Sequence, residues 1–406
     1  MPSLTTPRRS STSSPGHAGG AAPESGPGLS TLDEAELTAV LAELGEPAWR
    51  ARQIRRAAWQ PFVASLDDIH QLSAGLRGRL AGRLRFSTVT VAAESLADQG
   101  LTIKLLCALA DGQTVETVAM ESPARGGSGR RATVCVSTQV GCAVGCPFCA
   151  TGRMGLRRSC TPAEVVDQVR LAGQALHRHG LGPVTHVVYM GMGEPLAAYE
   201  TTLASVRALA GDGGISPRRI TVSTSGVVAG IRRLASEGLP VTLAVSLHAA
   251  TDELRDRLVP LNHAHPIDAL AAAAGAYART SGRRLTLEWC LIGGVNDGLD
   301  QAAGLIGIAR RLRAHVNVIP MNRIEGSAWG PPPAAVSRTF LRHLAAAGLT
   351  VTVRDTRGGD AAAACGQLRA ALEPRRDLRP DGTLGPQRPT RFATRGAAGQ
   401  ARPPGV

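Results

Sequence analysis

Aromatic residues are scarce in this chain, and long apolar runs are absent from it. Phe, Trp and Tyr make up 3% of the 406 residues, so the hydrophobic core must be built mainly from Ala, Val, Leu and Ile. No stretch approaches the roughly 18–20 consecutive apolar residues of a membrane-spanning helix. The first thirty residues also lack the apolar segment of a secretory signal. We therefore expect a cytoplasmic protein that has no membrane partner.

The overall composition is that of a globular protein with a basic surface. Hydrophobic residues account for 43% and charged residues for 19%, which excludes a wholly disordered chain, a collagen and a coiled coil. Lys and Arg outnumber Asp and Glu by 45 to 32, and Lys104 is the only lysine. Guanidinium groups pair with phosphate and stack on bases, so this excess favours an RNA partner. A general preference for Arg on a soluble surface would produce the same excess.

The cysteines are distributed unevenly. Of the 8 cysteines, the clustered ones are Cys135, Cys142, Cys146, Cys149 and Cys160. Such clustering in a long chain is typical of a metal or iron–sulfur centre rather than of the disulfide framework of a small secreted domain. Cys107 and Cys290 stand in apolar segments, and we expect them to be buried core thiols.

The segment from Cys142 to Cys149 has the spacing C-x3-C-x2-C. Three thiolates on one glycine-containing loop can bind three irons of a cubane cluster and leave the fourth iron open to substrate. The alternative is a zinc site that recruits Cys135 or Cys160 as a fourth ligand. Structural zinc sites usually have two C-x2-C pairs, and this chain has no second pair, which favours the open cluster.

Two segments precede the main domain after an N-terminal tail. Residues 1–30 are of low complexity and are expected to be disordered. Residues 31–87 are expected to form a small helical RNA-binding domain, and residues 88–131 a strand-rich connector. The apolar stripe of the helical domain, at helical spacing, contains Leu76, Leu80 and Leu84.

Residues 49–59 of this helical domain place four arginines between Trp49 and Trp59. We interpret the segment as a phosphate-binding helix whose ends can stack on bases. The alternative is a solvated basic face whose tryptophans pack inward.

In residues 132–372, apolar strands alternate with helical segments, which predicts a parallel sheet in an α/β fold and favours a full or partial barrel. The expected strands are residues 133–137, 184–190, 220–224, 241–247, 285–292, 316–319 and 349–353. One helix should begin at Thr161, with Pro162 in its first turn and Glu164 completing a capping box. The basic tail, residues 373–406, is again expected to be disordered.

The unusual residues follow the ends of the expected strands. Chemistry in such barrels lies on the loops that leave the C-terminal strand ends. Segments at these ends are residues 141–149, 191–195, 223–226 and 246–248, together with Asn322. We therefore expect them to surround one common mouth.

These motifs resemble those of the RlmN/Cfr family of radical S-adenosylmethionine (SAM) ribosomal RNA adenine methyltransferases. The C-x3-C-x2-C spacing with an aromatic residue before the third cysteine is typical of radical SAM enzymes, and the longer string of residues 135–152 is similar to this family in particular. Further similar segments are residues 115–118, 191–196, 223–226, 246–249, 294–297, 317–322 and 363–368. The resemblance extends from about Gly45 to Leu368 and implies a partial (β/α)6 radical SAM barrel, TIM-like, with a small N-terminal helical domain.

The resemblance also implies a role for each candidate residue. Cys142, Cys146 and Cys149 are expected to ligate a 4Fe–4S cluster, which acts with two SAM molecules per turnover. The implied SAM pocket contains Gly193, Glu194, Ser223, Ser246, Leu247, His248 and Asn322. The implied catalytic residues are Cys365, which is methylated on sulfur, Cys135, which resolves the adduct by forming a disulfide bond, and Glu116, the general base. A glutamate after a strand is more often a surface or cross-strand residue, and we assign no role to Glu288.

The implied reaction is methylation of carbon 2 of an adenine in 23S ribosomal RNA, adenine 2503 in the family, and also of adenine 37 in transfer RNA. The resemblance also implies that an electron donor such as flavodoxin or ferredoxin supplies electrons to this reaction. Carbon 2 lies between two ring nitrogens and is too poor in electrons to attack a sulfonium methyl, so a radical route is needed. Two alternatives stay open: Cfr-type methylation of carbon 8, which confers antibiotic resistance, and a non-catalytic iron–sulfur RNA-binding paralogue.

Overall fold

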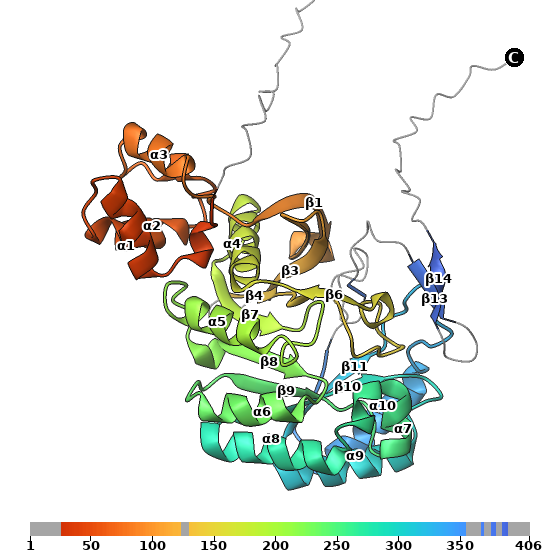
Figure 1. The fold of residues 1–406 in the computed structure, drawn as a ribbon. Helices are drawn as coiled ribbons and strands as arrows, with labels where there is room; N and C mark the ends of the chain where they lie inside the picture. Colours follow the sequence, from red (N-terminus) through yellow and green to blue (C-terminus); the bar gives the residue numbers. More distant parts are fainter. Residues whose placement is uncertain (1–25, 123–129, 355–366, 369–374, 379–383, 389–406) are drawn as a thin grey trace, which may run out of the picture.

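The chain folds around one large curved sheet, shown in Figure 1. The computed structural model describes residues 26–122, 130–354, 367–368, 375–378 and 384–388. Ten strands of this part pair in the order β1-β2-β3-β4-β7-β8-β9-β10-β11-β12. The pairings from β1 to β4 are antiparallel. From β4 onward, each strand pairs in parallel with the next strand of the sheet.

The parallel part of the sheet confirms the expected partial barrel. Its strands are β4 (Arg131–Cys135), β7 (Val184–Tyr189), β8 (Ile220–Thr224), β9 (Thr242–Ser246), β10 (Thr286–Leu291), β11 (His315–Pro320) and β12 (Val351–Val353). The helices between them are α4 (Pro162–Arg178), α5 (Tyr199–Ala210), α6 (Val228–Ser236), α7 (Asp252–Leu258), α8 (Ile267–Ser281), α9 (Leu299–Leu312) and α10 (Ala334–Ala346). Among the described strands β12 pairs with β11 alone, so the barrel stays open at that edge.

Aliphatic side chains hold the helices against the outer face of this sheet. Val187, Leu243 and Val316 are fully buried, and aliphatic residues of this kind suit a strand covered on both faces. Helix α4 begins as the sequence predicts: Thr161 Oγ1 accepts from the Glu164 amide at 3.2 Å, and Glu164 Oε2 accepts from the Thr161 amide at 2.8 Å. This capping box fixes the N-terminal end of α4, the helix that follows the cysteine loop in the chain.

The segment expected as a strand-rich connector extends the same sheet. Its strands are β1 (Val89–Ala97), β2 (Thr102–Leu109) and β3 (Thr114–Ser122), and β3 pairs antiparallel with β4. Val118 lies opposite Cys135 in that register. Residues directly opposite each other in a ladder point to the same face, so β3 presents side chains to the same side of the sheet as Cys135.

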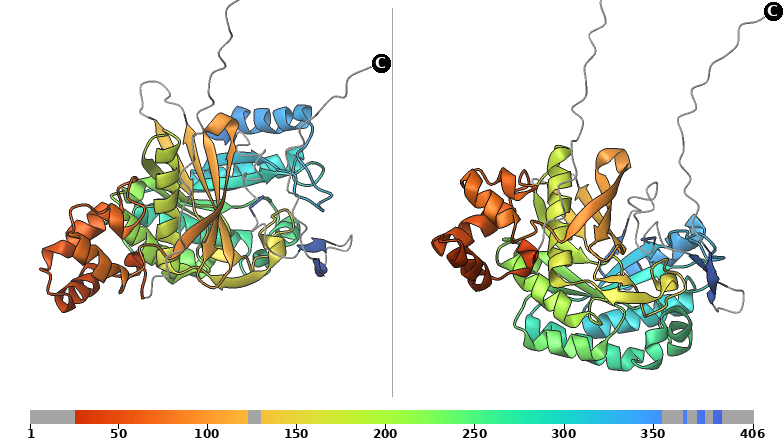
Figure 2. Two further views of the ribbon diagram at one scale, coloured as in Figure 1. Left: turned by 90° about the horizontal axis from the view of Figure 1, so that it is seen from above. Right: turned by 45° about the horizontal axis from the view of Figure 1, so that its top comes forward.

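The N-terminal helices form a small unit with a core of its own. They are α1 (Glu34–Glu43), α2 (Trp49–Ala58) and α3 (Ala74–Ala81). The predicted stripe of Leu76, Leu80 and Leu84 is buried in this core, together with Leu37 of α1 and Ile54 of α2. Leu29, which precedes the expected start of this domain at residue 31, is also buried there. Figure 2 shows these helices on one side of the molecule, next to α4.

Buried polar contacts attach this unit to α4. The Asp167 carboxylate accepts from Ser30 Oγ at 2.6 Å, from the Thr88 amide at 2.7 Å and from the Arg170 guanidinium at 2.7 Å. Arg170 also donates to the Ala58 carbonyl of α2 at 3.0 Å and stacks on the ring of Phe86. Removing one member of such a buried pair typically costs about 3–5 kcal/mol, so this contact fixes the position of the N-terminal unit.

The remaining elements are short. The strands are β5 (Gln139–Gly141), β6 (Leu156–Ser159), β13 (Arg375–Leu378) and β14 (Leu384–Arg388), and 3-10 turns occur at Leu29–Thr31, Leu66–Asp68, Asp98–Gly100, Gly152–Met154, Pro217–Arg219 and Pro260–His263. The antiparallel pair β13–β14 lies within the C-terminal segment, residues 373–406. In the described part of the chain, no helix is long and apolar enough to cross a bilayer.

Candidate active site

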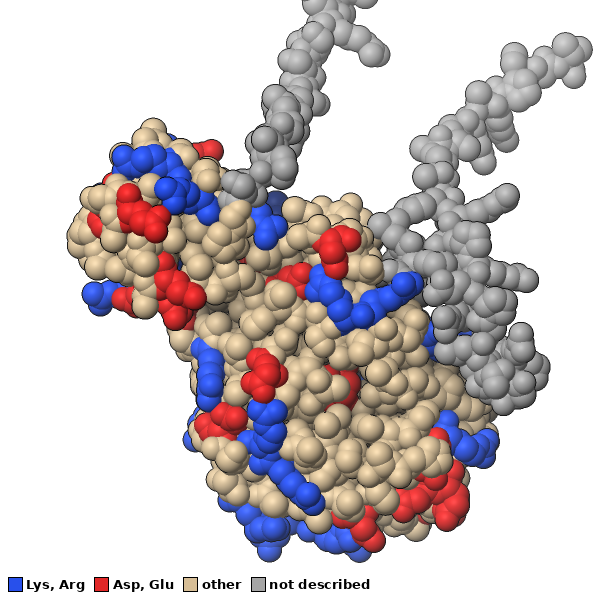
Figure 3. Space-filling view, viewed as in Figure 1, with Lys and Arg blue, Asp and Glu red and all other residues tan. Residues whose placement is uncertain are grey.

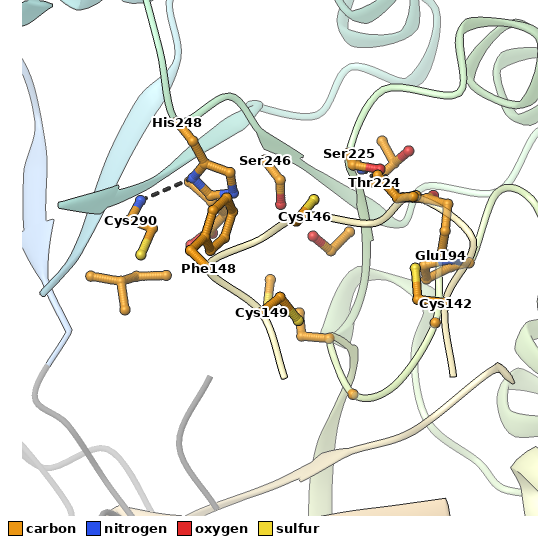
Figure 4. Close-up of a pocket in the computed structure, with 18 of the residues that line it drawn as sticks. Cys142, Cys146, Phe148, Cys149, Glu194, Thr224, Ser225, Ser246, His248 and Cys290 are labelled. Carbon is orange, nitrogen blue, oxygen red and sulfur yellow. Dashed lines mark hydrogen bonds between the residues drawn. The ribbon is translucent and has the colours of Figure 1, made fainter. Parts of the chain in front are cut away.

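One cavity opens at the C-terminal ends of the parallel strands, where the sequence predicts a common mouth (Figure 4). Of the predicted site residues, its lining contains Cys142, Cys146, Cys149, Gly193, Glu194, Ser223, Ser246, His248 and Asn322. Leu247 is instead buried in the main hydrophobic core. The structure therefore brings together residues from the cysteine loop and from the ends of β7, β8, β9 and β11.

The cysteine loop depends on glycines at two close approaches. Gly141 has φ +77°, and a Cβ on it would lie 1.8 Å from the Gly155 carbonyl oxygen. A Cβ on Gly152 would lie 2.8 Å from the carbonyl oxygen of Cys146. The Cys149 amide donates to that same Cys146 carbonyl at 3.1 Å, which closes the turn between the second and third cysteines. These contacts fix the path of the loop along the cavity wall.

The thiols of this loop lie close together, with Cys142 buried and Cys146 and Cys149 half-buried. Burial, with a contribution from the neighbouring Cys149, raises the pKa of Cys142 to about 12 and that of Cys146 well above its ordinary value. The three thiols can therefore ionise together only beside a cationic partner, and a cluster of irons is such a partner for soft sulfur ligands. Cys135 and Cys160, the candidate fourth zinc ligands, are not among the described residues that line the cavity. In that part of the chain no three His, Cys, Asp or Glu side chains gather around one metal-ion position.

Glu194 is the buried carboxylate of the cavity. Its Oε2 accepts from the Ser225 amide at 2.7 Å and from Ser225 Oγ at 2.6 Å, while Oε1 accepts from the Leu196 amide at 3.0 Å. Burial raises the pKa of Glu194, and the hydrogen bonds from Ser225 oppose that rise. Gly193 before it has φ +103°, and a Cβ there would lie 2.6 Å from Gln139. The carboxylate is thus held at one orientation, suited to receive an ammonium group.

Arg255 links the loops after β8 and β9, and no motif in the sequence indicated this role. This arginine of α7 is fully buried and donates to the carbonyls of Ser225 at 2.5 Å, Ser246 at 3.1 Å and Leu247 at 3.1 Å. Burial lowers its pKa to about 10, so the guanidinium stays charged at neutral pH. Arg255 therefore fixes the backbone of two of the segments predicted to contact SAM.

His248 adopts a backbone conformation that is uncommon for a residue other than glycine. Its φ is +61°, and its Nδ1 accepts from the Cys290 amide at 2.9 Å. Burial lowers the pKa of His248 to about 3, and the charge of Arg255 lowers it further, so the ring is neutral with its proton on Nε2. The ring meets Phe148 edge-on, with centroids 5.0 Å apart. The residue thus joins the cysteine loop to the ends of β9 and β10.

In the segment 294–297, Asn296 bonds to the backbone at the ends of two strands. Its side-chain amide nitrogen donates to the carbonyl of His248 at 2.8 Å and to that of Cys290 at 2.7 Å, and its Oδ1 accepts from the backbone amide of Ile292 at 2.7 Å. This buried asparagine therefore satisfies the backbone at the cavity ends of β9 and β10.

Two residues of β10 line the cavity without having been predicted there. Cys290, expected in the core, lines the cavity beside His248 (Figure 4). Glu288 has the expected cross-strand role, since it lies opposite Asn317 of β11, but it is buried and also lines the cavity. Its Oε2 accepts from Asn317 Nδ2 at 2.6 Å. Burial raises the pKa of Glu288, while nearby Arg354 and the Asn317 hydrogen bond lower it.

Two of the predicted catalytic residues lie on the sheet next to this cavity rather than in its lining. Cys135 ends β4, and Glu116 lies on β3 with its carboxylate 3.3 Å from the Lys104 ammonium. Ser137 donates to the Glu116 carbonyl at 2.6 Å, so Glu116 is level with the C-terminal end of β4. The third, Cys365, lies outside the described residues, and so does the predicted disulfide with Cys135. No disulfide joins cysteines of the described part of the chain.

Comparisons with known proteins match both parts of this architecture. The model of the Radical SAM superfamily matches residues 136–305, and that of the Ribosomal RNA large subunit methyltransferase N-terminal domain matches residues 28–85. A crystal structure of a radical SAM methyltransferase from Sphaerobacter thermophilus superposes with a TM-score of 0.80 at 47% identity, covering 84% of this chain and 99% of that one. The class is therefore that of the radical SAM enzymes.

Curated relatives narrow the class to a family. Proteins named "Probable dual-specificity RNA methyltransferase RlmN" are 46% identical in Frankia alni, over 84% of this chain and 83% of the relative, and 46% identical in Salinispora tropica, over 85% and 94%. The one from Moorella thermoacetica is 44% identical over 83% and 95%. The chain belongs to the RlmN family of radical SAM RNA methyltransferases. Membership implies SAM and a 4Fe–4S cluster as cofactors, which the three thiols at the cavity wall and Glu194 fit.

Proposed function

We propose that this protein methylates carbon 2 of an adenine in 23S ribosomal RNA, the family's adenine 2503, and adenine 37 of transfer RNA. The observation that carries the proposal is the convergence of the cysteine loop and Glu194 on one cavity at the strand ends. An electron-poor carbon needs radical chemistry, and this cavity fits the cofactors that provide it. The relatives named above as dual-specificity RNA methyltransferases support an RNA substrate.

In the proposed site, the three loop cysteines hold the cluster and the surrounding loops hold SAM. Cys142, Cys146 and Cys149 are the cluster ligands. When bound, the cluster and SAM supply a one-electron cleavage of a carbon–sulfur bond, which yields a radical that abstracts hydrogen and which no side chain can provide. Glu194 accepts a hydrogen bond from the SAM ammonium. The rest of the SAM pocket consists of Gly193, Ser223, Ser246, Leu247, His248 and Asn322.

Three residues carry the methyl group and the proton. The Cys365 thiolate accepts a methyl group from a first SAM by displacement, since a thiolate is a soft nucleophile. Removal of a hydrogen atom from the Cys365 methyl group would leave a sulfur-borne methylene radical that joins carbon 2 of the adenine, and the unpaired electron of this adduct would return to the bound cofactors. Glu116 would accept the proton from carbon 2. The Cys135 thiolate would then attack the sulfur of Cys365, so that the carbon–sulfur bond breaks, the released methylene takes up a proton to become the methyl group, and a disulfide is left.

The placement of Glu116 and Cys135 supports these roles. Both lie on strands next to the cavity, and the register of β3 and β4 turns them toward the same face of the sheet. The chain leaves the described residues at Arg354, which lines the cavity, and re-enters them near Leu368, whose carbonyl accepts from Thr151 Oγ1 at 2.5 Å. Thr151 follows the third loop cysteine by two residues, so both flanks of the segment that contains Cys365 adjoin the site.

The test is anaerobic reconstitution with iron and sulfide, followed by reaction with SAM, a reductant and protein-free ribosomal RNA. Mass spectrometry of the nucleosides should find 2-methyladenosine, and Cys365→Ala should abolish it, while Cys160→Ala, remote from the cavity, retains it. Methylation at carbon 8 would assign the Cfr-type reaction instead. Failure to form 5′-deoxyadenosine would identify a non-catalytic paralogue. Repeating the reaction on a transfer RNA anticodon stem-loop tests the second substrate.

A further inference from the structure

A second groove lies on the N-terminal unit, along the outer side of α2. Its lining includes Trp49, Arg56, Gln60 and Phe62. Trp49 is 52% exposed and Phe62 is 64% exposed, the highest values among the large hydrophobic side chains of the described residues. Only 3% of the residues of this chain are aromatic, and these two exposed rings do not pack in the hydrophobic core. Two such rings in one groove point to a ligand with flat apolar faces.

Trp49 is held in place by its neighbour Arg50. The guanidinium of Arg50 covers its ring at 4.6 Å from the centroid. Arg50 is in turn fixed by Glu46, whose carboxylate accepts at 3.2 Å, and by Gln53, whose Oε1 accepts at 2.9 Å. The indole is therefore ordered before any ligand binds, so stacking on it costs little conformational entropy.

The opposite side of α2 faces the barrel. Arg55 forms an ion pair with Asp212, and the ring of Trp59 lies next to Gly213, where an added Cβ would come within 3.1 Å of it. Of the two tryptophans that the sequence suggested for base stacking, Trp49 is exposed, whereas Trp59 packs at the domain contact. This division of the helix leaves the groove open while fixing it relative to the barrel.

The chemistry of the lining suits nucleotides. It contains the guanidinium groups of Arg52 and Arg56 and the side-chain amides of Gln53, Gln60 and Gln71, but no carboxylate. On the face of the molecule shown in Figure 3, by contrast, basic and acidic side chains are interspersed. Guanidinium groups contact phosphate, amides bond to base edges, and aromatic rings stack on bases that have left a helix.

We propose that this groove binds an unpaired segment of the RNA substrate, with one base stacked on Trp49 and another on Phe62, and with Arg56 on the phosphate between or beside them. The inference rests on the proposed RNA substrate, and it adds a docking site away from the nucleotide that is methylated. A base-paired helix hides its base faces, so it cannot use these two rings.

The test measures binding of labelled, protein-free ribosomal RNA to the reconstituted full chain. Trp49→Ala and Phe62→Ala should each raise the Kd at least fivefold, because stacking on one aromatic ring is worth about that factor or more. Trp49→Phe should retain most of the affinity. Leu299→Ala removes a side chain that is 50% exposed on α9 and should leave the Kd unchanged. Unpaired RNA should compete for binding, and a duplex of the same sequence should compete far less.

Separate readouts distinguish this inference from the proposed function. Formation of 5′-deoxyadenosine without RNA should be unchanged in the groove variants, while the KM for RNA rises. Methylation with a wild-type KM in both alanine variants would overturn the inference and leave the proposed function intact. Suppose instead that the wild-type protein binds RNA without methylating it, and that the groove variants bind RNA more weakly than the wild type. This result would support the groove and refute the catalytic proposal. Equal competition by the duplex and by unpaired RNA would also overturn the groove proposal.

Discussion

The ammonium group of Lys104 lies 3.3 Å from the carboxylate of Glu116, across the antiparallel strands β2 and β3. The Glu116 side chain is only 3% exposed, so this ion pair is largely shielded from water. Lys104 is opposite Val118, and Val118 is opposite Cys135, so the ammonium, the carboxylate and the thiol share one face of the sheet. Every other basic residue of the 45 is an arginine, which makes this single amine distinctive.

Replacing Lys104 should impair the proton-accepting step. Lys104→Met removes this ammonium from beside the buried carboxylate, and breaking a buried ion pair typically costs about 3–5 kcal/mol, so we expect methyl transfer to slow at least tenfold. SAM cleavage without RNA should continue, and RNA-linked protein should accumulate on a denaturing gel because the adduct is not resolved. Lys104→Arg should recover part of the rate. If Lys104→Met slows Glu116→Gln protein as much as it slows the wild type, Lys104 does not act through Glu116.

Glu194 should determine SAM affinity. Glu194→Gln replaces a carboxylate oxygen that accepts from Ser225 by an amide, which places a donor against a donor and removes the charge that an ammonium group would meet. We expect the Kd of SAM, measured by equilibrium dialysis on reconstituted protein, to rise at least tenfold. Ser225→Ala keeps the carboxylate and removes one hydrogen bond, so its effect should be smaller. Equal affinity in Glu194→Gln would place the ammonium elsewhere.

The glycine before the first loop cysteine should be intolerant of any side chain. Gly141→Ala would bring a Cβ within 1.8 Å of the Gly155 carbonyl oxygen, besides the cost of φ +77°. Gly112→Ala, at φ +79° in the β2–β3 turn, meets nothing within 4 Å and carries the backbone cost alone. Urea unfolding should therefore show a loss of about 1 kcal/mol for Gly112→Ala and a clearly larger loss for Gly141→Ala. Similar losses would contradict the assigned close approach.

Stability should fall in mild acid because of His248. Its pKa is lowered from 6.5 to about 3 in the fold, so between these values the unfolded chain binds a proton that the folded chain does not. From pH 7.5 to pH 5 this group alone should lower the free energy of unfolding by about 2 kcal/mol.

His248→Asn is the matched variant for this pH effect. Asparagine tolerates the positive φ and offers Oδ1 to the Cys290 amide, but it does not titrate. Urea unfolding at the two pH values should therefore show a smaller drop for His248→Asn than for the wild type. An identical drop in both proteins would assign the acid sensitivity to other groups.

The parts of the fold that depend on local pattern could be predicted from the sequence. The apolar segments at residues 184–190 and 220–224 became β7 and β8 within a residue of the expected bounds, because their period and flanking helices are local properties. The capping box at Thr161 is local as well. The common mouth followed from one topological rule, that parallel strands bring their C-terminal ends to the same edge.

The contacts made across the fold could not be predicted. Nothing near Arg255 in the sequence indicates that it bonds to carbonyls of two other loops, since those carbonyls come from β8 and β9. Glu288 and Cys290 alternate with Trp289 along β10, but which set faces the cavity depends on how the sheet curves. Trp49 and Trp59 look equivalent in sequence and differ because only one meets the barrel.

Helix α4 connects the two ends of the molecule without an intervening hinge. Asp167 and Arg170 grip the N-terminal unit, while Gln168 between them accepts from the Ser137 amide at 2.8 Å and donates to the Ser137 carbonyl at 3.0 Å. Ser137 in turn bonds to the Glu116 carbonyl and to the Met192 amide at the rim of the cavity. If a large polyanion tilts the N-terminal helices, these contacts therefore transmit the tilt through one turn of α4 to the C-terminal end of β4, next to Glu116 and Cys135.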